Sequence, residues 1–321
     1  MAKRLVIQLR PQEASWEEAL ERFLRHKAAQ GVREATLQDY RYKIGQFFRA
    51  YPGSWPDALE QPLLQWLAEA KAAATYNLRL SAMRLFLAWA RDRGFVCGDP
   101  LKDFRMRRKP DRVVDIPEDV IRKLLTLPNK DTYVGLRDYA LLTLFLDTGI
   151  RPNEAFQLLV SDIDLAAKEV RVRPEVAKTG LPRVLPISDV TAKALDDFLA
   201  VRPSDWPDSK PVFTSVYGNP LDRNSWGDVM ERYSKKLGKR VRPYDLRHTF
   251  AVAFLRRGGN AFALQRIMGH RSMDMTRRYV NLVQGDIREM HHRASPISSL
   301  VPQHRTKLKI PGPTKPGAKR K

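Results

Sequence analysis

Apolar residues recur every three or four positions through the first third of the chain, which is the spacing of helices that bury one face. Ser15, with Glu18 three residues later, forms a capping box at the start of the first helix. The fourth helix extends from about Thr75 to Arg93 and stops at Gly94. The apolar positions of the four helices are, in order, Trp16, Leu20, Phe23 and Leu24; Leu37, Tyr40, Ile44, Phe47 and Phe48; Leu63, Leu64, Trp66 and Leu67; and Leu80, Met83, Phe86, Leu87 and Ala90. Four such helices can share one core.

After Val113 the pattern predicts a second region, which begins with helices. Pro117 marks a first helical turn, and a more buried helix covers residues 138–147 and stops at Gly149. Pro152 then starts another helix. Proline is tolerated in the first helical turn, because a backbone N–H there would have no partner within the helix.

Two short segments of this region, residues 169–173 (EVRVR) and 183–187 (RVLPI), are predicted to be strands with Lys178 in the turn between them. Later helices are expected to begin at four capping residues and to break at the Gly258-Gly259 pair. Those capping residues are Ser188, Asp222, Asn260 and Ser272. The predicted fold class is mainly α with a small β-sheet, in the α+β sense.

The net charge of the chain indicates that it binds a polyanion. The 321 residues include 57 Lys and Arg against 36 Asp and Glu, a net charge of +21. Each phosphate neutralised by such a chain releases condensed counterions, which favours nucleic acid as the partner. A membrane partner is not expected, since the longest mostly apolar run, residues 139–146, is too short to cross a bilayer.

The single cysteine, Cys97, excludes an internal disulfide and a cysteine-based metal site. The first ten residues carry positive charge but only a short apolar patch, so no secretion signal is recognised. We therefore expect a soluble, cytoplasmic protein.

Basic residues concentrate between the two regions, where Arg105, Arg107, Arg108 and Lys109 precede Pro110. A solvated loop and a linker lying along a phosphate backbone account for them equally well. The last 31 residues, 291–321, contain eight Lys and Arg, five prolines and no acidic residue. They are interpreted as a flexible basic tail.

The residues with candidate chemistry are Arg151, Lys178, Arg247, His270 and Tyr279. One guanidinium group can bind two phosphate oxygens at once, and a tyrosine hydroxyl can act as a nucleophile toward phosphorus. Arg151 lies at a helix start, with Glu154 three residues later on the same face, where the carboxylate can orient the arginine. Each of these residues is unremarkable alone, and it is their combination that indicates chemistry on a nucleic-acid backbone.

Together, five segments of the chain resemble the tyrosine recombinase, or phage integrase, family. They are residues 147–154 (DTGIRPNE), 178–180 (KTG), 245–250 (DLRHTF), 268–270 (MGH) and 276–279 (TRRY). The resemblance covers about residues 15–290. It implies an N-terminal helical core-binding (SAM-like) domain at 1–104, a basic linker at 105–112, a catalytic domain at 113–290 and the basic tail at 291–321. The two domains would clamp double-stranded DNA.

The resemblance also implies a role for each site residue. Tyr279 would attack the scissile phosphate and form a 3′-phosphotyrosyl link, while Arg151 and Arg247 hold the nonbridging oxygens. Lys178 would protonate the leaving 5′ oxygen, His270 would donate a hydrogen bond to the phosphate, and Glu154 would support the arginines. No cofactor is implied, neither ATP nor a divalent metal. Four copies would assemble on paired DNA sites, and a monomer is expected when the protein is free.

One position departs from the family pattern, because Tyr244 stands where the family usually has histidine, three residues before the second arginine. A phenol is a poor base near neutral pH, since its pKa is roughly 10. If this position takes the proton of Tyr279, the step is slower here or belongs to another group. The neighbouring His248 is interpreted as structural.

Three functions remain open at this point. A site-specific recombinase, either Xer-like or the integrase of a mobile element, accounts for most of the residues. An architectural DNA-binding relative with weak cleavage is the first alternative, which the tyrosine at position 244 permits. A type IB topoisomerase shares the phosphotyrosyl chemistry but relaxes supercoils alone.

Overall fold

The computed structural model describes residues 14–108, 114–283, 291 and 294–300. The chain separates into two compact units, residues 1–111 and 112–321. The division falls within the basic stretch between the two regions recognised in the sequence.

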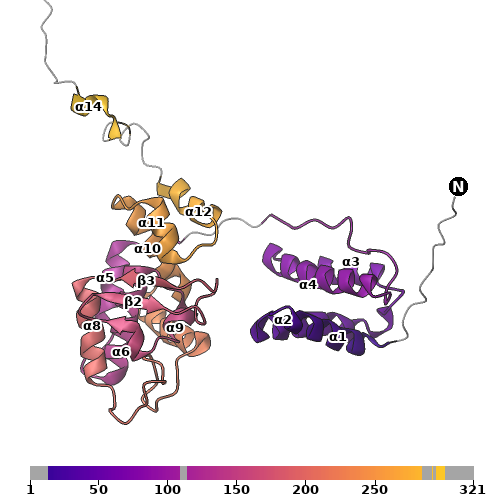
Figure 1. The fold of residues 1–321 in the computed structure, drawn as a ribbon, viewed down its shortest axis with the longest axis horizontal. Coiled ribbons are helices and arrows are strands. Elements are labelled where there is room, and N and C mark those ends of the chain that lie inside the picture. Colours follow the sequence, from indigo (N-terminus) through magenta and orange to yellow (C-terminus); the bar gives the residue numbers. More distant parts are fainter. Residues whose placement is uncertain (1–13, 109–113, 284–290, 292–293, 301–321) are drawn as a thin grey trace, which may run out of the picture. The chain divides into compact units, whose positions relative to one another are not determined.

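The first unit is helical, and α1 packs on α2 while α3 packs on α4 (Figure 1). Its helices are α1 (Trp16–Ala29), α2 (Glu34–Ala50), the short 3-10 helix η1 (Pro52–Ser54), α3 (Glu60–Ala68) and α4 (Ala73–Asp92). Aromatic rings fill the shared core, where Phe23, Phe47, Phe48 and Phe86 are fully buried. Ser15 caps α1 as predicted, its hydroxyl accepting the backbone N–H of Glu18 at 3.2 Å. Leu64 is an exception among the predicted core positions, because it is 51% exposed.

The second unit combines helices with one small sheet. Its elements are α5 (Glu118–Thr126), α6 (Tyr133–Thr148), α7 (Pro152–Ala155), η2 (Val160–Asp162), β1 (Ile163–Asp164), β2 (Glu169–Val172), β3 (Arg183–Pro186), α8 (Asp189–Ala200), α9 (Arg223–Leu237), α10 (Pro243–Arg256), α11 (Ala261–Met268) and α12 (Asp274–Val283), followed by α14 (Ile297–Leu300). The antiparallel sheet has the order β1-β2-β3, and Val170 pairs with Leu185 across its two longer strands. The predicted fold class, mainly α with a small sheet, is confirmed.

Helix α6 lies in the middle of this unit, packed against α8 and α10. Leu141, Leu142 and Phe145 are fully buried on it, in agreement with the buried helix predicted from the sequence. Gly149 ends α6 in the left-handed conformation, with φ 60°. A side chain there would place its Cβ 2.4 Å from a ring carbon of Phe250, so glycine serves both the turn and the close approach of α10.

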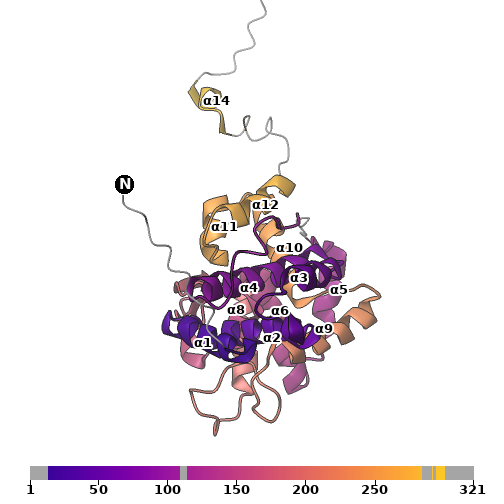
Figure 2. The same cartoon turned by 90° about the vertical axis from the view of Figure 1, so that its right-hand side faces the viewer.

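Helices α10, α11 and α12 form one group at one end of the second unit, as both views show (Figures 1 and 2). The side chains shared by the three helices include those of Phe250, Leu264, Met268 and Tyr279. The break at Gly258-Gly259 between α10 and α11 is confirmed, as is the N-cap at Asn260. The cap expected at Ser272 is wrong, since α12 begins at Asp274, two residues later. This group of helices carries three of the predicted site residues.

Candidate active site

Both predicted arginines are buried, and their guanidinium groups donate to carbonyls at the ends of helices. Arg247 of α10 is 1% exposed and donates from Nη2 to the carbonyl of Met268 at 2.7 Å and from Nη1 to that of Gly149. Arg151, the N-cap of α7, donates from Nη2 to the carbonyl of Gly269 at 2.9 Å. Helices leave their last carbonyls without intrahelical partners, so the arginines satisfy the C-terminal ends of α6 and α11.

The pKa of Arg247 is lowered to about 10, by burial first and then by the charge of Arg151. The guanidinium therefore keeps its positive charge at neutral pH. Its Nε has no hydrogen-bond partner among the described residues although it is buried. A buried donor without a partner is costly, and a phosphate oxygen is the kind of acceptor that would satisfy it.

Glu154 connects three separate segments of the second unit. Its Oε1 accepts hydrogen bonds from Nη1 of Arg151 at 3.1 Å and from the backbone N–H of Lys178 at 3.2 Å. Its Oε2 accepts from Nη2 of Arg183 at 2.5 Å and from the backbone N–H of Arg151 at 3.3 Å. Burial raises the pKa of Glu154, but the hydrogen bond from Arg183 and the charges of both arginines outweigh it and lower the pKa below its ordinary value. The carboxylate is therefore ionised, and each of its two oxygens accepts two hydrogen bonds.

Arg183 was missed by the sequence reasoning, which placed it only in a strand. It is the first residue of β3, and its Nε also donates to the carbonyl of Ile267 at 2.8 Å. An arginine at the start of a short strand carries no signal of such a role, because only the fold brings it to Glu154.

Lys178 lies in the turn between β2 and β3, where the sequence predicted it. Its backbone is fixed to the site by Glu154, and the residue itself is exposed. The structure therefore brings the turn to the carboxylate that also binds Arg151.

His270 follows the left-handed Gly269 at the end of α11, and both ring nitrogens are held by contacts. Nε2 lies 3.1 Å from Nη2 of Arg247, and arginine can only donate, so Nε2 accepts. The ring proton is then on Nδ1, which donates to Oγ1 of the fully buried Thr276 at 2.8 Å. The pKa of His270 is lowered to about 3, by burial first and then by the charges of Arg247 and Arg151. His270 is consequently neutral at physiological pH.

Tyr279 of α12 is 2% exposed, and its ring lies parallel to that of His270, with centroids 6.2 Å apart. Its hydroxyl oxygen is 2.8 Å from Nδ1 of His248. Burial raises the pKa of Tyr279, and the charges of Arg247 and Arg278 only partly oppose this. The phenol is therefore protonated in the free protein.

Tyr244 is 47% exposed, and its ring packs edge-on against that of His248, with centroids 5.2 Å apart. The sequence placed Tyr244 among the catalytic residues and treated His248 as structural. The structure brings His248 to the hydroxyl of Tyr279, and the ring of Tyr244 contacts that of His248. Sequence spacing gave no sign of this, because the contact joins α10 to α12 across 31 positions.

The basic stretch begins on the first unit rather than in a free loop. The guanidinium of Arg107 lies 3.9 Å above the ring of Tyr76 and donates to the carbonyl of Ala70 at 2.7 Å. The backbone of Arg107 exchanges two hydrogen bonds, both 2.8 Å, with the side chain of Asn77. The side chain and the backbone of Arg107 are thus held by contacts within the first unit.

Arg105 and Arg108 are exposed, and Lys109 lies outside the described residues. Arg107 is exposed as well, but its guanidinium is held by contacts within the first unit.

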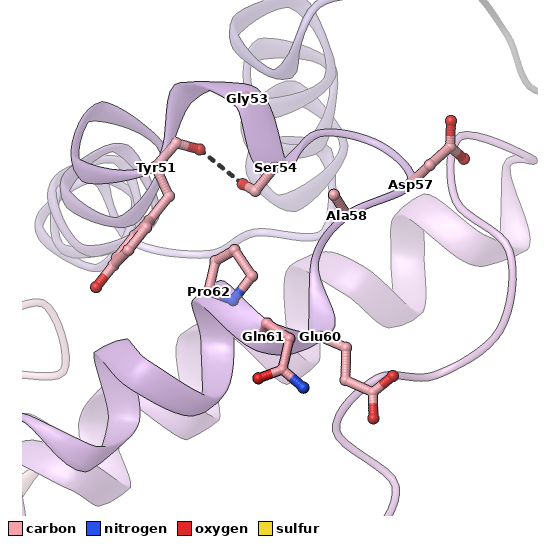
Figure 3. A pocket seen from close by; sticks show the side chains of 8 residues that line it. All are labelled: Tyr51, Gly53, Ser54, Asp57, Ala58, Glu60, Gln61 and Pro62. Carbon is pink, nitrogen blue, oxygen red and sulfur yellow. Dashed lines mark hydrogen bonds between the residues drawn. The ribbon is translucent and has the colours of Figure 1, made fainter.

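A cavity of about 400 Å³ opens on the first unit between η1 and the start of α3 (Figure 3). Asp57 and Glu60 are among its lining residues, and the hydroxyl of Ser54 donates to the carbonyl of Tyr51 at 2.7 Å beside it. Its lining includes two carboxylates and no arginine or lysine, so it is unsuited to phosphate.

Within the described residues, no group of three or more His, Cys, Asp or Glu is placed to hold a metal ion. In the same part of the chain, none of the helices has the length and apolar character needed to cross a bilayer.

Comparison with known proteins decides the family. The sequence model described as "Phage integrase family" matches residues 115–285, and that of the "Phage integrase, N-terminal SAM-like domain" matches residues 20–94. The chain belongs to the phage integrase family. The family recognised from the five motifs in the sequence is therefore confirmed.

Several similar proteins are named as Xer recombinases. The chain is 31% identical over 304 residues to "Tyrosine recombinase XerC" of Roseiflexus castenholzii, which covers 88% of this chain and 95% of that protein. It is 30% identical over 315 residues to "Tyrosine recombinase XerD" of Xanthomonas campestris, covering 90% and 95%. Phage integrase family members of this kind cleave and rejoin DNA, and this chain is a tyrosine recombinase acting in site-specific recombination.

Solved structures share the fold at lower identity. The Tn1549 transposon integrase in complex with transposon right end DNA has a TM-score of 0.71 at 19% identity, covering 88% of this chain and 98% of that one. A lambda integrase dimer bound to a COC′ core site has a TM-score of 0.66 at 20% identity, covering 82% and 97%. This likeness shows that the chain shares the fold of these integrases.

Proposed function

We propose that Tyr279 is the nucleophile of this recombinase and that Arg151, Arg247 and His270 bind the scissile phosphate. The observation that carries the proposal is that Tyr279 stacks on His270 and that His270 contacts Arg247, which brings a phenol and candidate phosphate-binding groups together. Arg151 joins this group through the carbonyl of Gly269, next to His270.

In the proposed reaction, the hydroxyl oxygen of Tyr279 forms a bond to phosphorus and the bond to the 5′ oxygen breaks. The products are a 3′-phosphotyrosyl link and a 5′ hydroxyl, whose proton comes from Lys178. The two guanidinium groups stabilise the extra negative charge of the transition state. Because these cations are side chains and the phosphodiester energy is kept in the covalent link, neither a divalent metal nor ATP is required.

His270 must change its hydrogen bonding to serve this phosphate, because its Nε2 accepts from Arg247 in the free protein. The positive charges of Arg247 and Arg151 help to lower its pKa. A bound phosphate anion offsets those charges, so we propose that DNA binding raises the pKa of His270 and makes Nε2 a donor.

For the DNA contacts outside the site, we propose that Arg105, Arg108 and Lys109 bind backbone phosphates, which position the protein without reading sequence. We further propose that four copies assemble on two paired sites in the cytoplasm and that the free protein is a monomer. The XerC and XerD names of relatives near 30% identity favour an Xer-like resolution role over integration of a mobile element.

The experiment that tests the nucleophile uses a nicked DNA substrate, from which the cut strand diffuses away so that the covalent product accumulates. Wild-type protein, Tyr279→Phe and the control Tyr217→Phe, at a tyrosine that is 85% exposed, are incubated with it in EDTA. On a denaturing gel we expect a slow protein–DNA band from wild type and from Tyr217→Phe.

Tyr279→Phe should bind the same DNA without giving that band. A band from Tyr279→Phe would move the nucleophile to another residue. Binding by wild type without any band, on a confirmed site, would instead support the architectural DNA-binding relative.

A further inference from the structure

The hydroxyl of Tyr279 already has a partner in the free protein, and that partner is a potential base. Nδ1 of His248 lies 2.8 Å from the hydroxyl oxygen, within the range expected of a base that removes a proton. His248 is 8% exposed and follows Arg247 on α10, so the helix that supplies the phosphate-binding arginine also supplies this imidazole.

The hydrogen bond can run in the direction that proton transfer needs. Burial raises the pKa of Tyr279, so the phenol is protonated and can donate. A neutral imidazole with its proton on Nε2 offers an unprotonated Nδ1 to accept it. The pair is therefore arranged for transfer of the phenolic proton to His248.

Tyr244 is less suited to this transfer. Its hydroxyl belongs to a ring that is 47% exposed and that contacts His248 edge-on. An uncharged phenol is also a weak proton acceptor.

We propose that His248 is the general base of this recombinase, taking the proton of Tyr279 at Nδ1 as its oxygen bonds to phosphorus. The inference rests on the proposed role of Tyr279 as nucleophile. The proton moves to His248, the Tyr279 oxygen–phosphorus bond forms, and the bond to the 5′ oxygen breaks. The leaving oxygen takes its proton from Lys178, so His248 ends the step positively charged and Lys178 neutral. When the 5′ hydroxyl attacks in the rejoining step, both transfers reverse.

The test measures the single-turnover rate of covalent adduct formation on the nicked substrate for wild type, His248→Asn and Tyr244→Phe. Asparagine can accept the same hydrogen bond through its carbonyl oxygen but cannot take the proton. Since general base catalysis contributes about 10²–10⁴-fold, we expect His248→Asn to be slower by at least about 100-fold. Tyr244→Phe, which keeps the ring and loses the hydroxyl, should stay within about threefold of wild type on the same scale.

A second substrate separates the base from the acid. When sulfur replaces the leaving 5′ oxygen, the leaving group departs without a proton, so a Lys178→Ala variant should regain most of its lost rate. His248→Asn should remain slow on this substrate. Recovery of His248→Asn with sulfur would overturn the proposal, as would a rate for that variant within about threefold of wild type on ordinary DNA.

A folding failure is recognised by DNA affinity and melting temperature, which should match wild type in His248→Asn. Should that variant lose DNA binding, His248→Ala with added imidazole gives the same decision, because free imidazole in the vacated space should restore part of the rate. Absence of that rescue would contradict the proposal. Failure of the nucleophile assignment itself is distinguishable, since Tyr279→Phe would then still form the adduct.

Discussion

Replacing Glu154 by glutamine should destabilise the second unit more than its small change in shape suggests. Four donors converge on the two carboxylate oxygens, namely Nη1 and the backbone N–H of Arg151, Nη2 of Arg183 and the backbone N–H of Lys178. Glutamine retains one oxygen, so two of the four donors would face an amide NH₂ group. If the amide keeps the oxygen shared by Arg151 and Lys178, Arg183 loses its only carboxylate partner among the described residues.

The magnitude follows from these contacts. A hydrogen bond to a charged group contributes about 1.5–3 kcal/mol, and removing one partner of a buried ion pair costs about 3–5 kcal/mol. We therefore expect the free energy of unfolding of the second unit to fall by about 3–5 kcal/mol. Rotation of Arg151 away from the phosphate site should also slow adduct formation.

Amide hydrogen exchange measured by mass spectrometry is the suitable assay, because peptides from β3 and α10 report on the second unit alone. Glu231→Gln on α9 is the matched control, since this glutamate is 67% exposed and only 3.4 Å from Lys235 in an i,i+4 pair. That control should lose no more than about 0.5 kcal/mol. A loss below about 1 kcal/mol in Glu154→Gln would refute the view that its carboxylate holds the site together.

The pH dependence has a definite sign. The pKa of Glu154 is lower in the folded protein than its ordinary value of 4.5, so its stabilising effect is complete above that pH. It is lost as the pH falls through the folded pKa. The difference between wild type and Glu154→Gln should therefore be constant from about pH 6 to 8 and shrink below about 4.5.

Two further changes test the site and the DNA contacts. Thr276→Val removes the acceptor of the Nδ1 proton of His270, which costs about 1–3 kcal/mol for an unpaired buried donor, and we expect adduct formation to slow by roughly tenfold or more in the nicked-substrate assay. Arg108→Ala should weaken DNA binding and reduce the salt slope by about one, whereas Arg107→Ala should leave the slope nearly unchanged and lower the melting temperature of the first unit, since its guanidinium already has partners there. Equal slopes for the two variants in binding titrations would contradict this distinction.

The sequence predicted those features whose cause is local. Ser15, Ser188, Asp222 and Asn260 cap helices because a short polar side chain before an apolar period accepts the first free N–H groups. Gly149 ends α6 because glycine adopts the left-handed conformation without strain. Strand β1 was missed because its two residues, Ile163 and Asp164, are too few to show an alternation.

What the sequence could not predict depends on distant parts of the chain meeting. Leu64 has the right spacing for a core residue but faces solvent, because the periodicity of a nine-residue helix does not fix which edge of its apolar face is covered. Arg183 and His248 reach the site only through the packing of β3 and α10 on other elements. The resemblance to the family indicated the type of reaction. The hydrogen-bond partners of each site residue could be identified only from the structure.

The position of the two arginine side chains has a consequence for how loss of function is interpreted. Arg247 and Arg151 satisfy the C-terminal ends of α6 and α11 by donating to the carbonyls of Gly149, Met268 and Gly269. Loss of activity in a variant at either arginine therefore has two possible causes. The ends of the two helices lose their side-chain donor, and the phosphate of the proposed substrate loses a binding group. Genetic screens that score only recombination would count both as catalytic lesions. Tyr279→Phe removes a single oxygen from a ring that packs in the core. If Tyr279 is the nucleophile as proposed, this variant is the cleaner reference for a folded protein without activity.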